Sequence, residues 1–375
     1  MKRLALFVLL LFPLLVGAAP QADFAKEFAT SKGKKLDIDL KTGGDIAISG
    51  WDRDVVSVKG FREGRDGSEA TLDMEETSSG VSVSSRYTGS RRHRSGGIRL
   101  EISVPGRYDV HLQSMGGGVS IENVEGAMTG KTMGGALTLS GLKGRLDLLT
   151  MGGEITLKNS DVDGNVKTMG GAVLLADVTG DVKPSSMGGD VTQKNVTRRS
   201  GAATGREVNI STMGGDINVD DAPQGASLST MGGAIHVRSA ARFVKAKTMG
   251  GEVRLDAVDG WIDATTMGGN VEATMTGDPA AGKRSVALSS MSGDITLGVP
   301  ASLSMDIDIE LAFTEGHEGE YTIKSDVPLT QEVSPRWERE EGTPRKIIHA
   351  AGSVAGGNNR ITIKTVNGNV TLRKL

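Results

Sequence analysis

The feature that most constrains this chain is the tripeptide Met-Gly-Gly, which recurs with a fixed 18-residue period. A fixed period of this kind is the sequence signature of a repeat architecture. The series closes with a variant, Met291-Ser-Gly, and two of its steps are longer, from 187 to 213 and from 267 to 291. These longer steps indicate insertions into an otherwise regular repeat. The regular units begin at Met115, Met133, Met151, Met169, Met187, Met213, Met231, Met249 and Met267.

Each repeat carries apolar residues at alternating positions, counted from its methionine as position 0. Position 4 is Val, Ile or Leu in all ten repeats, and position 6 is apolar in all but one, where Gln193 stands. Position 5 between them is mostly polar, and this alternation is typical of a short strand with one buried face. A second pair of mostly apolar positions, 13 and 15, follows in the second half of the repeat. The unit therefore reads as two nine-residue halves, each a turn followed by a strand.

Neither half can bury its apolar face alone, but stacked repeats bury a continuous core. The sequence therefore predicts an all-β fold, a single elongated β-solenoid or β-helix of 18-residue coils with irregular β caps at both ends. Nine steps at the sheet spacing of ~4.8 Å give a rod of roughly 43 Å. We expect an N-terminal cap region over residues 24–112, the regular solenoid over 113–298 and a C-terminal cap region over 299–375. Segments 42–48 and 366–372 match positions 0 to 6 more loosely.

The glycine at position 2 is present in every repeat, which predicts a turn residue with a positive φ angle. We expect the methionines to point into a corner of the core, because methionine adapts to irregular gaps. The predicted turn glycines are Gly117, Gly135, Gly153, Gly171, Gly189, Gly215, Gly233, Gly251, Gly269 and Gly293.

The N-terminus has the features of an export signal. Lys2 and Arg3 precede an apolar run over residues 4–16, and small residues follow. This pattern predicts a signal peptide over residues 1–18, with cleavage as late as residue 22, and no transmembrane segment afterwards. The chain has no cysteine, which excludes disulfides, and a net charge of −3, which argues against nucleic acid as a partner. We therefore expect a periplasmic, cell-surface or extracellular protein.

Four segments carry a resemblance to a known family. They are Gly44-Asp-Ile-Ala-Ile-Ser-Gly-Trp-Asp52, Ser114-Met-Gly-Gly-Gly-Val-Ser-Ile121, Ser290-Met-Ser-Gly-Asp-Ile-Thr-Leu297 and Ile361-Thr-Ile-Lys-Thr-Val-Asn-Gly-Asn-Val-Thr-Leu372. With them the chain resembles the bacterial family of β-strand-repeat proteins known as putative adhesins, a domain of unknown function. The resemblance implies a β-solenoid fold and supplies no catalytic residues. The strict methionine departs from the serine or asparagine more usual in that family.

Other chemistries fit the sequence less well. An acid recurs at position 3, but calcium needs several converging oxygen ligands, and small residues alternate with the acid. A hydroxyl column at position 17 is best explained as a hydrogen-bonded ladder. The five histidines have no partner at motif spacing, so neither an enzyme nor a cofactor or metal site is indicated. The basic stretch 91–94 is a solvated loop or a contact for an anionic envelope polymer.

Function on repeat scaffolds often gathers where insertions interrupt the repeat. Both insertions follow position 9, so both loops should leave the same edge of the rod, about 19 Å apart. We expect them to frame a contact surface made of Arg198, Arg199, Arg206, Asp278 and Lys283. The predicted function is a non-enzymatic exported protein presenting a rigid surface to an unknown envelope polymer, cell surface or protein. The alternatives are a periplasmic structural or envelope-stress scaffold and, less favoured, a polysaccharide-active enzyme.

Overall fold

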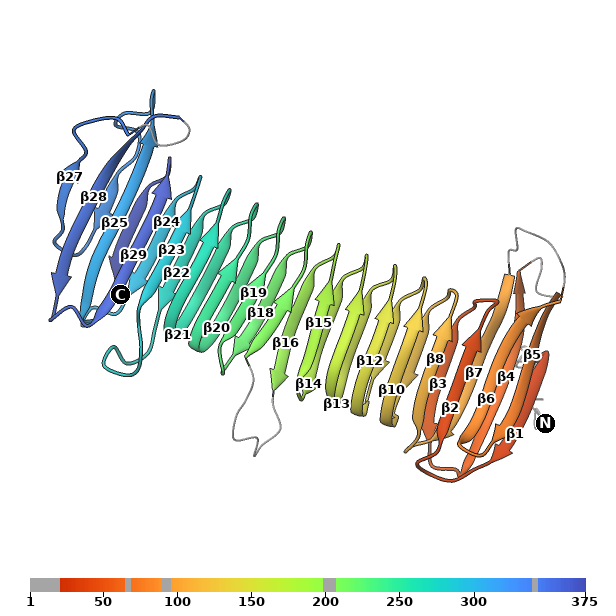
Figure 1. The fold of residues 1–375 in the computed structure, drawn as a ribbon. Helices are drawn as coiled ribbons and strands as arrows, with labels where there is room; N and C mark the ends of the chain where they lie inside the picture. The colour runs from red at the N-terminus through yellow and green to blue at the C-terminus, as the bar shows by residue number, and fades with distance from the viewer. Residues whose placement is uncertain (1–20, 65–68, 89–95, 198–206, 339–342) are drawn as a thin grey trace, which may run out of the picture.

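A computed structural model describes residues 21–64, 69–88, 96–197, 207–338 and 343–375. These residues form thirty β-strands and no α-helix, which confirms the all-β class. The strands follow one another along an elongated body whose two ends carry the N- and C-terminal parts of the chain (Figure 1). No helix among the described residues is long and apolar enough to cross a membrane. The predicted signal peptide lies almost wholly outside the described residues.

Eight strands belong to the N-terminal region: β1 (Phe24–Ala29), β2 (Lys35–Leu40), β3 (Ile46–Trp51), β4 (Val55–Gly64), β5 (Ala70–Thr77), β6 (Gly80–Tyr87), β7 (Gly96–Pro105) and β8 (Asp109–Ser114). The repeats contribute β9 (Val119–Glu122), β10 (Glu125–Thr132), β11 (Leu137–Ser140), β12 (Lys143–Thr150), β13 (Ile155–Thr168), β14 (Val173–Thr179), β15 (Val182–Ser186), β16 (Val191–Thr197), β17 (Val208–Ser211), β18 (Ile217–Ala222), β19 (Ala226–Ser229), β20 (Ile235–Lys247), β21 (Val253–Thr266), β22 (Val271–Met275), β23 (Val286–Ser290) and β24 (Ile295–Val299). The C-terminal region holds β25 (Met305–Thr314), β26 (Ile323–Ser325), β27 (Thr330–Val333), β28 (Arg345–Val354), β29 (Asn359–Val366) and β30 (Val370–Lys374).

The repeats pair in two parallel ladders whose partners hold the same position in successive repeats. In the first ladder, Leu137 of β11 lies between Val119 of β9 and Ile155 of β13. In the second ladder, Leu146 of β12 pairs with Met128 of β10. The long strands β13, β20 and β21 run through both ladders. The hydrophobic period therefore sets the register, because a one-residue slip would turn every buried side chain outward.

The first ladder keeps its register across both insertions. Val191 pairs with Ile217 across the first, and Val271 pairs with Ile295 across the second. The extra residues of the second insertion, between β22 and β23, therefore leave the stack as a loop. The second ladder is thin at the first insertion, since β15 and β17 share a single pair, Ser185 with Ser211.

Both ends join the same stack through segments distant in sequence. Ile46 of β3 pairs in parallel with Val119 of the first repeat, and Val370 of β30 pairs with Ile295 of the last. The chain between them turns back on itself in antiparallel pairs, β1 and β7 on β4, β5 on β6, and β25 and β27 on β28. Such irregular strands cover the open edges that a bare parallel stack would leave.

The core is one continuous cluster of buried side chains that runs from Phe28 to Leu372. The apolar residues of positions 4 and 6 are buried in every repeat, as Leu137 and Leu139 are at 1% and 0% exposure. Burial of this aliphatic column is the main stabilising term of the fold, since each fully buried side chain contributes about 1.5–3 kcal/mol.

The prediction that the methionines fill a corner of the core is wrong. All ten repeat methionines are exposed, from 38% for Met151 to 63% for Met115. Each methionine lies in the tight bend that follows a strand. The period-2 alternation that assigns strand side chains to the inner or the outer face does not extend into this bend, so it does not predict where the methionine points. The corner is filled instead by the hydroxyl residue before each methionine, such as Thr132 and Thr150, both 0% exposed.

The glycines of position 2 do lie in the turns, but the predicted reason for them is wrong in nine of ten cases. Only Gly117 has a positive φ, at 86°. At the other nine, a Cβ would lie under 3.0 Å from the backbone of the equivalent glycine one coil earlier. Glycine is required because successive turns stack backbone on backbone at the sheet spacing, and no side-chain atom fits between them.

The hydroxyl column of position 17 is the hydrogen-bonded ladder that the sequence predicts. Thr150 Oγ1 donates to the carbonyl oxygen of Gly135 one coil earlier at 2.9 Å and accepts from the N–H of Gly153 at 3.2 Å. The same pair of bonds recurs at Thr168 and at Thr266. Each hydroxyl therefore satisfies one buried donor and one buried acceptor of the Met-Gly-Gly turn.

Candidate functional site

The predicted contact residues divide between described and undescribed segments. Arg198, Arg199 and Arg206 lie outside the described residues, as does the basic stretch 91–94. Asp278 and Lys283 are described, and both are exposed on the loop between β22 and β23. This loop protrudes from the lower edge of the body in Figure 1. The structure therefore gives the geometry of the second insertion only.

The second insertion is anchored by Arg284, which is 1% exposed and was not singled out from the sequence. Its guanidinium donates to the carbonyl oxygens of Thr276 at 2.6 Å and Ala281 at 3.0 Å. It also pairs with the carboxylate of Asp259 on β21 at 2.5 Å. A buried guanidinium needs this many partners because its desolvation is costly. Arg284 thereby fixes both ends of the loop to the stack.

Two aromatic rings stack beside this anchor. Phe243 of β20 and Trp261 of β21 face each other one coil apart, with ring centroids 4.8 Å apart and an interplanar angle of 10°. The Nζ of Lys283 lies 5.4 Å from the Trp261 ring centroid on its other side. Both rings are half-buried. We call Phe243, Asp259, Trp261, Asp278 and Lys283 the loop corner.

The loop corner presents ring edges and charge rather than an open aromatic face. Gly225 lies against the free face of Phe243, where a Cβ would come under 3.0 Å from the ring, and Lys283 covers Trp261. The indole N–H of Trp261 has no hydrogen-bond partner among the residues that the structure describes. Asp278 accepts from the N–H of Ala280 at 2.9 Å, which shapes the loop. The loop corner thus carries an indole, two carboxylates and an ammonium group.

An open depression lies on the same ladder, toward the N-terminus. Its floor is made by Gly126, Gly144 and Gly164, whose positive φ angles exclude other residues, and its sides include Arg145 and Lys183. Five coil steps from Met151 to Met249 separate it from the loop corner by about 24 Å. Both features face outward from one ladder, so an extended partner could contact both.

Gln193, the one polar residue among the position 6 side chains, is 4% exposed in the core. Its Oε1 has no hydrogen-bond partner among the described residues. A small cavity beside it is lined by Val182, Val196 and Val208 at the first insertion. The break in the repeat and the polar core position therefore coincide in space, as their sequence positions indicated.

The recurrent acids of position 3 cap the ladder instead of converging on one point. Asp190 Oδ1 accepts from the N–H of Asp216 at 2.8 Å, and Asp216 Oδ1 accepts from the N–H of Ala234 at 2.7 Å. Asp190 and Asp216 thus each bond the next repeat. No group of three or more His, Asp or Glu side chains able to hold a metal ion occurs within the described part of the chain.

Ion pairs elsewhere on the surface hold strands together. On the first ladder, Asp256 accepts from His236 at 2.7 Å and from Arg254 at 2.8 Å. Partial burial raises the pKa of Asp256, but these two hydrogen bonds lower it more, so the pKa lies below the ordinary value. Arg254 also reaches Glu272 at 3.4 Å. The network joins three successive coils.

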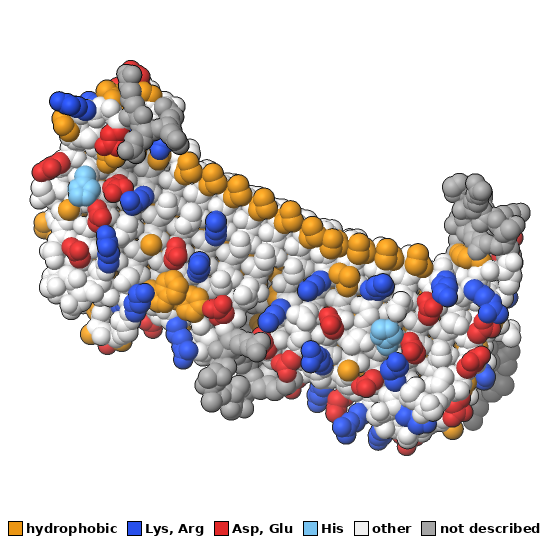
Figure 2. Space-filling model, in the orientation of Figure 1, with side chains coloured by type: hydrophobic (Ala, Val, Ile, Leu, Met, Phe, Trp, Pro, Cys, Tyr) orange, Lys and Arg blue, Asp and Glu red, His pale blue; other side chains and the backbone are white. Residues whose placement is uncertain are grey.

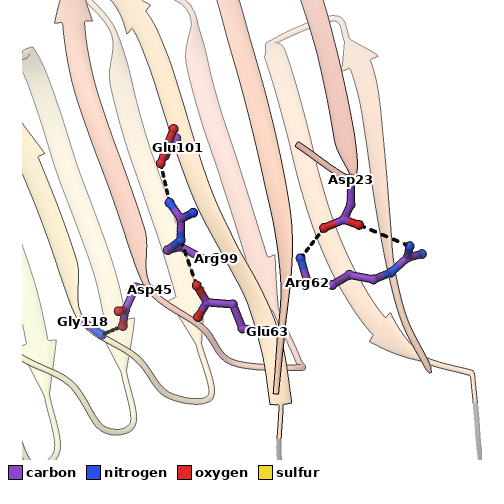
Figure 3. A network of polar contacts seen from close by, with 7 residues as sticks. All are labelled: Asp23, Asp45, Arg62, Glu63, Arg99, Glu101 and Gly118. Atoms are coloured by element: carbon purple, nitrogen blue, oxygen red, sulfur yellow. Dashed lines mark hydrogen bonds and ion pairs between the residues drawn. The ribbon is translucent and has the colours of Figure 1, made fainter. Parts of the chain in front are cut away.

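A second network links strands of the N-terminal region (Figure 3). Arg99 on β7 donates to Glu63 on β4 at 2.9 Å and to Glu101, and these bonds, the one to Glu101 foremost, raise its pKa. Asp23 pairs with Arg62, and Asp45 accepts from the N–H of Gly118 at 2.7 Å. Apart from the Arg99–Glu101 contact within β7, these contacts tie parts of the N-terminal region to each other or to the first repeat.

The repeat methionines form a continuous apolar line along one edge of the body (Figure 2). They account for ten of the twelve exposed large hydrophobic side chains among the described residues, and the other two are Val333 and Leu375. The repeat shows that methionine recurs at one position, but it does not show that the methionine side chains point outward. The aromatic pair was detectable as two bulky rings at the same position of successive repeats.

Three solved structures are similar to this chain. A putative cell adhesion protein from Clostridium sporogenes ATCC 15579 shares 9% identity over 94% of this chain and 99% of that one, with a TM-score of 0.19. A putative adhesin from Parabacteroides distasonis ATCC 8503 shares 11% over 74% and 92%, with a TM-score of 0.27. A putative adhesin from Bacteroides fragilis NCTC 9343 shares 14% over 65% and 96%, with a TM-score of 0.23.

These neighbours are putative adhesion proteins, in agreement with the resemblance drawn from the sequence, and a likeness of this extent carries no argument about what the chain does. No protein-family model matches the chain, and no curated protein matches it.

Proposed function

We propose that this protein is an exported, non-enzymatic, adhesin-like binding protein, a β-solenoid of 18-residue coils whose second ladder contacts a polysaccharide of the cell envelope or of another cell. Export is supported by the basic start and apolar run of residues 1–18. The solenoid is supported by the 18-residue register of both ladders. A rigid stack suits a binding scaffold, because little conformational entropy is lost when it meets its partner.

The observation that carries the proposal is the loop corner, where Lys283 lies over the Trp261 ring and the buried Arg284 anchors the loop that bears Lys283. Tryptophan is among the residues that most often dominate the binding energy of contact surfaces. The unpaired indole N–H donates to hydroxyl oxygens, and the Lys283 ammonium attracts carboxylates. A hydroxyl-rich, partly acidic sugar chain offers both groups.

The length of the surface favours a polymer over a small molecule. Binding sites for small molecules are concave and enclose most of the ligand. The depression is open, and about 24 Å of ladder separates its Gly164 from Trp261. An extended chain that follows the ladder makes contacts at both places. Its overall affinity then exceeds that of each weak subsite alone.

The test is co-sedimentation of the protein lacking residues 1–18 with insoluble envelope polysaccharide. We expect Trp261→Leu and Lys283→Ala each to weaken binding about tenfold, as hot-spot truncations do. Lys158→Ala is the matched control, because it removes an exposed lysine of a regular repeat on the first ladder, away from the proposed contact surface. Unchanged binding by both loop-corner variants would refute the proposal, and it would favour a structural scaffold without a polymer partner.

A further inference from the structure

The exposed methionine row has a property that apolar contact alone does not explain. Positions 4 and 6 interchange Val, Leu and Ile freely, as any apolar role permits. Position 0 is methionine in all ten repeats although it is exposed. An exposed apolar side chain lowers solubility, and leucine would serve an apolar role equally well. The feature retained at this position is therefore the thioether sulfur.

Successive methionines stand one coil apart with their backbones in contact. The N–H of Met231 donates to the carbonyl oxygen of Met213 at 3.2 Å, and the N–H of Met249 donates to that of Met231 at 3.3 Å. The coil rise is therefore the sheet spacing of ~4.8 Å. A metal–sulfur bond is about 2.3 Å, so an ion held between two sulfur atoms separates them by about 4.6 Å. The spacing of the row matches that requirement.

The surroundings of the row leave the sulfur atoms accessible. Each methionine is followed by a small residue and then a glycine, so no bulky side chain stands beside it on that flank. The hydroxyl residue before it is buried and bonded to a turn carbonyl, as Thr150 is to Gly135. Three rotatable bonds allow neighbouring thioethers to turn toward each other. The nearest charged residues along the chain are a lysine two residues before Met133, Met169 and Met249, and the alternating acid three residues after the methionine.

A set of neutral thioethers selects among metal ions by softness. Thioether ligands favour Cu(I), whereas carboxylates favour calcium and magnesium, and zinc prefers thiolate and imidazole. We propose that the ten methionines, Met115 to Met291, form a linear array that binds Cu(I) ions between the thioethers of adjacent coils. The array lies along the turn edge and uses none of the loop-corner residues.

The first test is NMR of protein carrying ¹³C-labelled methionine methyl groups, titrated anaerobically with Cu(I) or with Ag(I) as a probe that resists oxidation. The chain supplies its own controls in Met128, Met275 and Met305, which are 0% exposed. We expect the methyl signals of the exposed methionines to shift on addition of either ion while those of the three buried ones stay unchanged. An absence of shifts among the exposed methyls would overturn the proposal.

The second test measures stoichiometry by competition with a chromophoric Cu(I) chelator. A variant with Met151, Met169 and Met187 changed to Leu keeps the apolar surface and removes three adjacent thioethers. We expect it to bind about 40% fewer Cu(I) ions, because four of the nine gaps between adjacent methionines are lost, while the Met128→Leu variant binds the wild-type number. Equal Cu(I) binding by the triple variant, or equal retention of Zn(II) and Cu(I) by the wild-type protein, would contradict a thioether site. Since the variant keeps its apolar surface and its loop corner, unchanged polysaccharide binding distinguishes the two proposals.

Discussion

The stacking of the turns makes a sharp prediction for two neighbouring glycines of one repeat. Neither Gly152 nor Gly153 has a positive φ, so alanine is compatible with the backbone at both. A Cβ on Gly153 would lie under 3.0 Å from the backbone of Gly135, whereas a Cβ on Gly152 would meet only the oxygen of Gly134 at 3.3 Å. The two substitutions therefore differ in steric overlap and in little else.

The cost of Gly153→Ala follows from what must move. Two backbones held at the coil rise by ladder hydrogen bonds must separate, and such overpacking costs about 1–3 kcal/mol. The movement also strains the two hydrogen bonds of Thr150 to this turn, each contributing about 0.5–1.5 kcal/mol. Reduced freedom of the unfolded chain offsets about 0.4–1 kcal/mol. We expect a net loss of about 2–4 kcal/mol for Gly153→Ala, and a change within about 1 kcal/mol for Gly152→Ala.

The assay is guanidinium unfolding followed by circular dichroism, with the free energy of unfolding obtained by linear extrapolation. Because stacked repeats can unfold in parts, hydrogen exchange of β11 and β13 is measured alongside. Gly153→Ala should speed exchange in those two strands, and Gly152→Ala should leave it unchanged. Equal stability of the two variants would show that close backbone stacking does not explain the position 2 glycine.

Two further predictions concern single side chains. Because its hydrogen bonds hold the pKa of Asp256 below the ordinary value, its stabilisation is present above that value and lost as pH falls through the folded-state pKa. The difference in free energy of unfolding between wild type and Asp256→Asn should therefore shrink from about pH 6 to about pH 3, and a constant difference in denaturation midpoints would contradict this. Arg284→Met leaves loop carbonyls unpaired and should cost about 2–4 kcal/mol with faster exchange in residues 277–283. The exposed Arg238→Met should change stability by less than about 0.5 kcal/mol, and equal losses for the two would refute the anchor.

The ends of the chain illustrate how far a period can be followed. The match of residues 42–48 to the repeat indicated a strand, and Ile46 does pair with Val119. What the period could not give is the path of the residues between them, which pair antiparallel as β4 with β7. Those pairings depend on which strand edges are left open at the end of the parallel stack, and these edges exist only once the stack has formed.

The candidate site divides in the same way. Asp278 and Lys283 were predicted because an insertion breaks the rhythm, and the break itself is a property of the sequence. The anchoring role of Arg284 was not predictable, because its partners Thr276, Ala281 and Asp259 meet only when the loop folds back on β21. The stack of Phe243 on Trp261 was not predicted, although the two rings hold equivalent positions in successive repeats.

The sequence by itself determined the all-β class, the register of both ladders and the buried aliphatic column, because alternation and a fixed period leave only one set of faces that can be buried together. Only the tertiary structure decided where the methionines point. Strand alternation does not apply to a turn residue, so the space left by the stacked backbones determines where its side chain points. With Thr150 and its equivalents filling the corner, that room is outside, so the most regular residue of the repeat is also its most exposed apolar one.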